Sequence, residues 1–291
     1  MGRIVKIPFI LIAVAGLSAC GGSATSVGPP PTTPIQGNVA GTAGGSTVTG
    51  TAHGVANGNP VAMTIGGTTI TGLVRDTTYD KGVLKAFVQS APDPIAGGTF
   101  SNYDAGHSGE SSTGAMSASV MNTDFTSAEA GGILRGANYA RVSGGTMPTT
   151  GGGDFTGDYA GGMGASNVSA FIITGDVTLT ADFGASTIFG SITNRVGKVN
   201  ILGTPNGFAD VDLVLTGIGA DGAFSGTATG GEFITTSSAT LGTVTSNTST
   251  YQGLIGGATG TEAAGAVKLL INYDAGGIIR DTTEVGVFIA E

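Results

Sequence analysis

The chain has 291 residues, of which 54 are Gly, 11% are charged and 6% are aromatic, and its formal net charge is −9. Glycine inside a regular element costs roughly 0.5–1 kcal/mol relative to Ala, so this composition excludes a helical protein. The glycines have no three-residue period, which excludes collagen, and 40% hydrophobic residues with few charges exclude full disorder. An all-β protein is expected.

Residues 1–19 are predicted to be a signal peptide. Arg3 and Lys6 form a short positive region, and an almost wholly apolar stretch follows from Ile7 to Ala19. A transmembrane helix needs roughly 20 apolar residues, so this stretch is too short to be a permanent anchor.

Leu17-Ser18-Ala19-Cys20 resembles a bacterial lipobox, in which the cysteine thiol is lipidated and becomes the new N-terminus. Cys20 is the only cysteine and comes directly after the apolar stretch, which favours lipid attachment over an ordinary cleavage site with a chance cysteine. More than one acyl chain gives stable membrane anchoring. In lipoproteins an Asp after the cysteine favours the inner membrane. Gly21 therefore points to the outer membrane.

Cleavage before Cys20 leaves nine basic and 20 acidic residues, a formal charge of −11. Phosphate backbones are bound by clustered Lys and Arg, and the chain has no such cluster, so we expect no nucleic-acid partner. Anionic lipid headgroups are disfavoured for the same reason.

Residues 20–36 are expected to form a tether, because they are rich in Gly, Pro, Ser and Thr and contain the run Pro29-Pro30-Pro31. A Gly-rich segment from Ser143 to Gly153 then divides the chain near Thr149. Residues 37–149 are predicted to be a smaller β-rich, handle-like domain. Its strand candidates are Val61 to Val74, Gly82 to Val88, Gly98 to Tyr103, Ala115 to Val120 and Gly132 to Val142.

Residues 150–291 are predicted to form an eight-stranded antiparallel up-and-down barrel, because eight runs are separated by short turn signals and closure removes sheet edges. In several runs apolar and polar residues alternate strictly, so that Val211, Leu213 and Leu215 are expected on one face. Such a barrel has room for packed side chains or one small ligand. The runs are Asp154 to Tyr159, Val168 to Leu179, Thr187 to Asn194, Ala209 to Leu215, Ala223 to Thr229, Thr248 to Gly256, Ala263 to Tyr273 and Ile278 to Ala290.

The motifs of this half resemble the transferrin-binding protein B-like β-barrel surface lipoproteins, a family whose relatives include factor H binding protein. The late-barrel signature of the family is matched by Glu262 and Gly265, whereas Leu254 and Ile255 stand where aromatics are commoner. Residues 37–149 resemble the handle domain of the family more weakly. The resemblance implies a binding lipoprotein. It does not imply transferrin as the partner, because the chain is short in the variable loops and handle region. The segments that carry it are Gly157 to Tyr159, Val177 to Gly184, Ile188 to Ile192, Ala223 to Gly226 and Tyr251 to Gly265.

Other motifs predict no catalytic, metal or cofactor site. Gly217 to Gly222 reads G-x-G-x-x-G, but no helix can follow it, so a hairpin turn is expected instead of a dinucleotide site. His53 and His107 have no metal-ligand spacing and are predicted to lie in solvated loops. Asp210 and Asp212 are expected on the polar face of a strand.

The sequence therefore predicts a non-enzymatic binding or adhesion module, lipid-anchored through Cys20 in the outer membrane. Its expected partners are the membrane, through the lipid, and an extracellular protein or a small solute. No cofactor is expected. Two alternatives stay open, an integral outer-membrane barrel and a secreted hydrolase with an unrecognised site.

Overall fold

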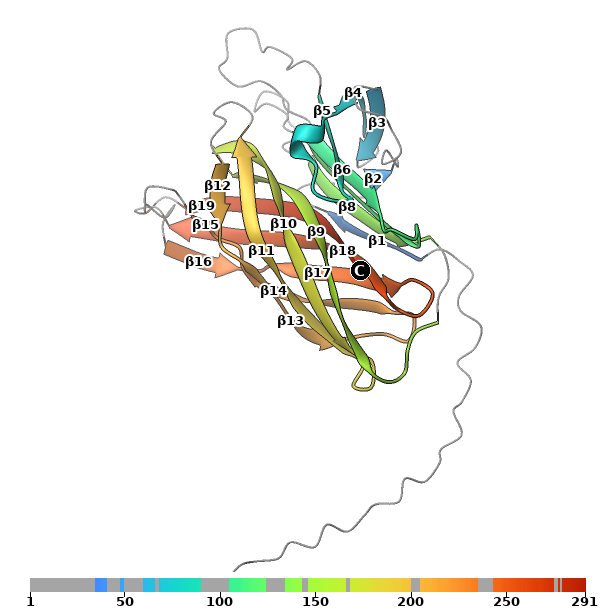
Figure 1. Ribbon diagram of the computed structural model, residues 1–291. Coiled ribbons are helices and arrows are strands. Elements are labelled where there is room, and N and C mark those ends of the chain that lie inside the picture. The colour runs from blue at the N-terminus through green and yellow to red at the C-terminus, as the bar shows by residue number, and fades with distance from the viewer. Residues whose placement is uncertain are drawn as a thin grey trace, which may run out of the picture.

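The computed structural model describes residues 35–40, 48–49, 60–65, 68–89, 105–123, 134–142, 146–165, 168–199, 205–234, 243–274, 277 and 279–291. The described residues fold into two antiparallel sheets, the second of which closes on itself (Figure 1).

The second sheet is a closed barrel of eight strands, each hydrogen-bonded to the next along the chain, and the last pairs with the first. The predicted up-and-down barrel is confirmed, and every predicted run overlaps one of its strands. The strands are β9 (Gly152–Ala165), β10 (Val168–Asp182), β11 (Thr187–Val199), β13 (Val211–Gly217), β14 (Ala223–Gly230), β17 (Thr250–Gly256), β18 (Glu262–Asp274) and β19 (Ile279–Ala290).

Three short strands extend one end of the barrel. β12 (Pro205–Phe208) pairs with β11, β15 (Phe233–Ile234) pairs with β12, and β16 (Thr243–Asn247) pairs with β18. At the other end, the segment Gly217 to Gly222 forms the β13–β14 turn, in which the Gly219 N–H donates to the Ala223 carbonyl and Gly222 has φ +83°. The predicted hairpin turn is confirmed.

The first sheet has the strand order β1-β8-β7-β6-β5-β4-β3-β2. The single strand predicted from Val61 to Val74 is wrong, because this stretch is two paired strands in which Ile65 lies opposite Thr68. The candidate Gly98 to Tyr103 lies outside the described residues. The strands are β1 (Ile35–Ala40), β2 (Val48–Thr49), β3 (Pro60–Ile65), β4 (Thr68–Arg75), β5 (Lys85–Gln89), β6 (Ala105–Glu110), β7 (Met116–Thr123) and β8 (Leu134–Arg141).

One side of the barrel is covered by the first sheet (Figure 1), and the contacts run from β7 and β8 of that sheet to β18 and β19 of the barrel. We call this side the covered wall: it consists of the outward residues Ala160, Leu254, Ala264, Ala266, Val285, Val287 and Ile289 on β9, β17, β18 and β19. They form one buried apolar cluster with residues of the first sheet, namely Leu84, Met116, Ala118, Val120, Ala137 and Tyr139. Burial of this apolar area stabilises the contact between the two sheets.

Polar contacts border the same interface. The Arg141 guanidinium donates to the Ile255 carbonyl at 2.9 Å, and the Val83 N–H donates to the Asp158 carboxylate at 3.0 Å. Lys81 forms an ion pair with Asp176. These contacts fix the orientation of the first sheet on the barrel.

Candidate binding site

The structure describes only some of the residues that the sequence analysis considered as site residues. Cys20 and His53 lie outside the described residues. His107 is not in a solvated loop: it is 1% exposed on β6, so that prediction is wrong. Its short Gly- and Ser-rich segment resembles a loop, but backbone pairing with β5 and β7 makes it a strand.

The burial of His107 lowers its pKa to about 4, against the opposing effect of its hydrogen bond with the Tyr79 carbonyl. An imidazole with this pKa is neutral at pH 7. We therefore assign His107 to the core of the first sheet.

The two residues of the late-barrel signature have structural roles. Glu262 is 2% exposed, and one of its carboxylate oxygens accepts a hydrogen bond from the Thr113 hydroxyl in the β6–β7 turn. A Cβ on Gly265 would lie 2.3 Å from the ring of Phe288. The signature therefore joins the barrel to the first sheet and makes room for a ring inside the barrel.

Glycines opposite aromatic rings recur through the barrel interior. In each case a Cβ on the glycine would lie between 2.2 and 2.7 Å from an atom of the aromatic side chain. Cross-strand packing of this kind stabilises a sheet and pins its register. The interior is thus occupied by packed side chains. The four pairs are Tyr159 with Gly286, Phe224 with Gly253, Tyr251 with Gly226 and Phe288 with Gly265.

One ion pair lies inside this apolar core. Arg195 on β11 contacts Glu284 on β19 at 2.5 Å, and the Tyr159 hydroxyl donates to the other Glu284 oxygen at 2.5 Å. Burial alone would lower the pKa of Arg195, but the carboxylate of Glu284 reverses this and raises it. Burial, together with the Glu284 charge, raises the pKa of Tyr159 well above its usual range. The pair is enclosed, so it links two strands that are not neighbours in the barrel rather than facing a ligand.

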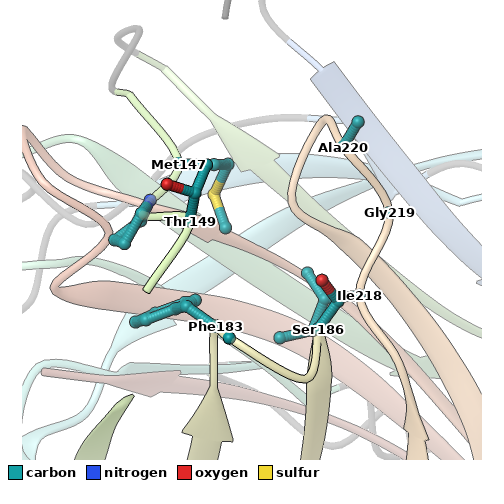
Figure 2. A pocket seen from close by; sticks show the side chains of 9 residues that line it. Met147, Thr149, Phe183, Ser186, Ile218, Gly219 and Ala220 are labelled. Carbon is teal, nitrogen blue, oxygen red and sulfur yellow. The ribbon is translucent and has the colours of Figure 1, made fainter. Parts of the chain in front are cut away.

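A cavity of about 290 Å³ lies at the hairpin end of the barrel (Figure 2). Met147 and Ile218 line the cavity and pack against the interior core, and Phe183 belongs to that core and also lines the cavity. The lining residues are uncharged: Met147, Pro148, Thr149, Phe183, Gly184, Ser186, Ile218, Gly219 and Ala220. Ligand sites typically have about 300–1,000 Å³, so this cavity suits a small, uncharged molecule.

A second hollow of about 320 Å³ lies on the outer surface where the first sheet ends. It is more open and is lined by Tyr139, Gly217, Ala223, Phe224, Ser225, Gln252 and Gly253. Residues of the β13–β14 hairpin thus line both hollows.

Among the described residues, none covers the outward faces of β11, β13, β14 and the second half of β10 in this way, whereas Ile172 near the start of β10 packs against Val88 and Ala105 of the first sheet. We call this side the open wall: it consists of Thr178, Thr180, Asp182, Phe189, Ser191, Asp212, Val214, Leu215, Ser225, Thr227 and Thr229. Asp212 lies on the exposed face of β13, as predicted, whereas Asp210 is exposed but precedes the strand, so its predicted place in the strand is wrong. The prediction that Leu215 shares a face with Val211 and Leu213 is wrong, because Leu215 is 61% exposed.

A β-bulge explains the position of Leu215. Ile188 pairs with Thr216 and Gly190 with Leu213, so Phe189 faces both Val214 and Leu215. A bulge places two residues of one strand opposite one of its neighbour. The hydroxyl of Tyr251, inside the barrel, donates to the Val214 carbonyl at 2.6 Å and holds the bulge.

Groups of three or more His, Cys, Asp or Glu side chains that could hold a metal ion are absent from the described part of the chain.

Among the described residues, no helix has the length and apolar character needed to cross a membrane.

No model of a known protein family matches the chain, and no curated protein matches it by sequence. Among solved structures, the chain is similar to intact Ap-TbpB with its N and C lobes, with 15% identity and a TM-score of 0.42 over 80% of this chain and 42% of that one. It is also similar to two mutant forms of the vaccine antigen transferrin-binding protein B from Haemophilus parasuis Hp5. The single mutant has 12% identity and a TM-score of 0.44, over 89% of this chain and 45% of that chain. The double mutant has 14% identity and a TM-score of 0.39, over 80% of this chain and 41% of that chain.

The chain thus spans less than half the length of these solved structures. They are structures of the same protein family that the sequence resembles.

Proposed function

We propose that the chain is an outer-membrane lipoprotein, anchored through Cys20, that acts as a non-enzymatic binding or adhesion module. The observation that carries this proposal is the lipobox Leu17-Ser18-Ala19-Cys20, followed by a Gly- and Pro-rich tether before the first strand. A lipidated N-terminus on an extended tether holds a folded domain beside a membrane.

The distribution of side chains in the barrel supports a domain that stands in water. Apart from the enclosed Arg195–Glu284 pair, its interior is apolar, whereas the open wall carries mainly Thr, Ser and Asp. Barrels that cross a membrane have apolar residues facing lipid and typically a polar interior. This contrast favours the lipid-anchored domain over the integral outer-membrane barrel.

A binding role is further supported by the positions of the polar side chains. His107 is buried and hydrogen-bonded to a backbone carbonyl, and the Arg195–Glu284 pair is enclosed in the core. A hydrolase needs a nucleophile or base within reach of substrate. The binding module is therefore preferred to the secreted hydrolase, and clear turnover in esterase, glycosidase and peptidase assays would reverse that preference.

The proposed partner is an extracellular protein, with a small uncharged solute as the second candidate. The cavity lined by Met147, Phe183 and Ile218 favours the solute. The open wall, which carries exposed apolar side chains, favours the protein. Transferrin is not carried over from the similar structures.

Partition between detergent and water tests the anchor. Full-length protein made in a lipoprotein-processing bacterium should enter the detergent phase, and Cys20→Ser should stay in the aqueous phase. If both proteins enter the same phase, lipid attachment at Cys20 is not what holds the chain at the membrane.

A further inference from the structure

Three of the six large hydrophobic side chains that the described residues expose lie together on the open wall. They are Phe189, 47% exposed, Val214, 41% exposed, and Leu215, 61% exposed. The bulge brings them into contact range, because Phe189 on β11 faces both residues on β13. We call these three side chains the bulge patch. Single exposed apolar residues are ordinary, but contiguous groups mark interaction sites.

The patch is held in place from inside the barrel. The Tyr251 hydroxyl donates to the Val214 carbonyl, and the Tyr251 ring packs on Gly226 and lies 6.1 Å from the Phe224 ring. A group fixed in this way loses little conformational entropy when it binds. The backbone that carries Val214 and Leu215 is therefore already in place before a partner binds.

Acidic side chains flank the patch. Asp182 on β10 and Asp212 on β13 are both exposed. Phe189 is paired with Thr180, two residues from Asp182, while Asp212 is paired with Ser191, two residues from Phe189. Diagonal neighbours of this kind lie about 7–8 Å apart on one face of a sheet.

Within the described strands that carry and border the patch, no basic residue offsets these charges. The strand segments 178–182, 187–193, 211–217 and 223–229 contain no Lys or Arg. A second copy of the chain is a poor occupant, because a twofold contact would bring the acidic rims together. An anionic membrane is repelled in the same way.

We propose that the bulge patch is the docking surface for a protein partner whose contact region has an aliphatic or aromatic centre flanked by Lys or Arg. Phe189 and Leu215 supply the apolar anchor of this contact. Asp182 and Asp212 attract and orient the basic rim of the partner. This inference rests on the proposed function as a binding module.

Selection from a random dodecapeptide library displayed on phage, with the purified chain as the target, tests the proposal. The selected peptides should combine Lys or Arg with Leu, Ile, Phe, Tyr or Trp. Their affinity should fall at least about tenfold for Phe189→Thr/Leu215→Thr, as expected for loss of an anchor. It should fall several-fold for Asp182→Asn/Asp212→Asn and on adding salt.

Val244→Thr is the matched control, because Val244 is 38% exposed on β16, away from the patch. It should leave peptide binding unchanged. The patch variants replace only exposed side chains, and their unfolding midpoints should equal that of the wild type, which separates lost binding from lost folding.

The proposal is overturned if no selected peptide distinguishes the wild type from Phe189→Thr/Leu215→Thr, or if the selected peptides are acidic. It is also overturned if the chain sediments as a dimer that Leu215→Thr dissociates, because the occupant is then a second copy. Peptides that bind equally to both forms would leave the binding module standing and remove only this docking surface. Failure of the detergent partition test concerns the anchor alone.

Discussion

The two walls of the barrel are built from the same kind of alternating strand but differ in what they face. The outward residues of the covered wall are Ala, Val, Leu and Ile, all buried against the first sheet. Those of the open wall are mainly Thr, Ser and Asp, interrupted by the bulge patch. Strands buried on both faces have continuous apolar runs, whereas strands with one wet face alternate.

This difference separates a wall that holds the two sheets together from the wall on which we place the proposed binding. The covered wall joins the two sheets through small and branched apolar side chains that pack closely. The open wall stays in water, and its exposed apolar side chains form one group, while Val196, further along β11, is exposed apart from them. We therefore expect substitutions on the covered wall to change stability and those on the open wall to change binding.

Placing a charge on each wall should give the largest contrast. Val287 is fully buried on the covered wall, so Val287→Lys should lower the free energy of unfolding by about 5 kcal/mol, as expected for an unpaired buried charge. Thr178→Lys on the open wall is the matched control and should change it by less than about 0.5 kcal/mol. Urea denaturation measures both, and similar losses in the two variants would show that the walls do not differ.

The buried ion pair joins the walls across the interior, because Arg195 belongs to the open-wall strand β11 and Glu284 to the covered-wall strand β19. Arg195→Met should cost about 3–4 kcal/mol in unfolding free energy, since it leaves the Glu284 carboxylate buried without its cation. The double variant Arg195→Met/Glu284→Met should recover most of this loss. A single variant as stable as the wild type would contradict the assignment.

His107 should make the covering sheet sensitive to acid. Its folded pKa of about 4 lies below the ordinary value of 6.5, so the unfolded chain binds the proton more readily. Stability is therefore kept above pH 6.5 and lost as the pH falls towards 4, by about 3 kcal/mol from this residue. His107→Asn should lack this contribution. If the pH profiles of unfolding free energy of the wild type and His107→Asn run parallel, the predicted contribution of His107 is refuted.

Tyr251→Phe should have the smallest effect on stability and act on the open wall. It removes the hydroxyl that donates to the Val214 carbonyl, and should cost about 1–2 kcal/mol. Amide hydrogen exchange should rise around residues 213–216 while the covered wall stays protected. Unchanged exchange at the bulge would mean that this hydrogen bond does not hold it.

The barrel could be predicted from the sequence because its strands alternate clearly and its hairpins are separated by Gly-rich turns. The first sheet was harder, since Ala105–Glu110 contains Gly, Ser and His and resembles a loop until its two neighbouring strands are known. For that reason the sequence suggests a solvated loop at His107, whereas the residue lies in β6. Likewise, the apolar pattern predicts a single strand from Val61 to Val74, although Gly66-Gly67 marks a turn in the sequence between the two paired strands.

The candidate site depends on the register in which the strands pair, and this register cannot be read from the sequence alone. Alternation places Leu215 inside the barrel, and only the bulge opposite Phe189 turns it outward. The same holds for the glycines opposite aromatic rings, whose partners lie on adjacent strands. The composition gives the number of glycines, but only the strand pairing shows that some of them make room for aromatic rings.

Thiol labelling most directly tests the central claim that the first sheet covers one wall and leaves the other free. Cys20 is the only cysteine, so Cys20→Ser gives a thiol-free chain into which Thr178→Cys or Ala266→Cys can be introduced. A maleimide should modify Thr178→Cys as fast as a free peptide thiol and Ala266→Cys at least about 100-fold more slowly, because Ala266 reacts only when the structure opens. Equal rates at the two positions would contradict the account.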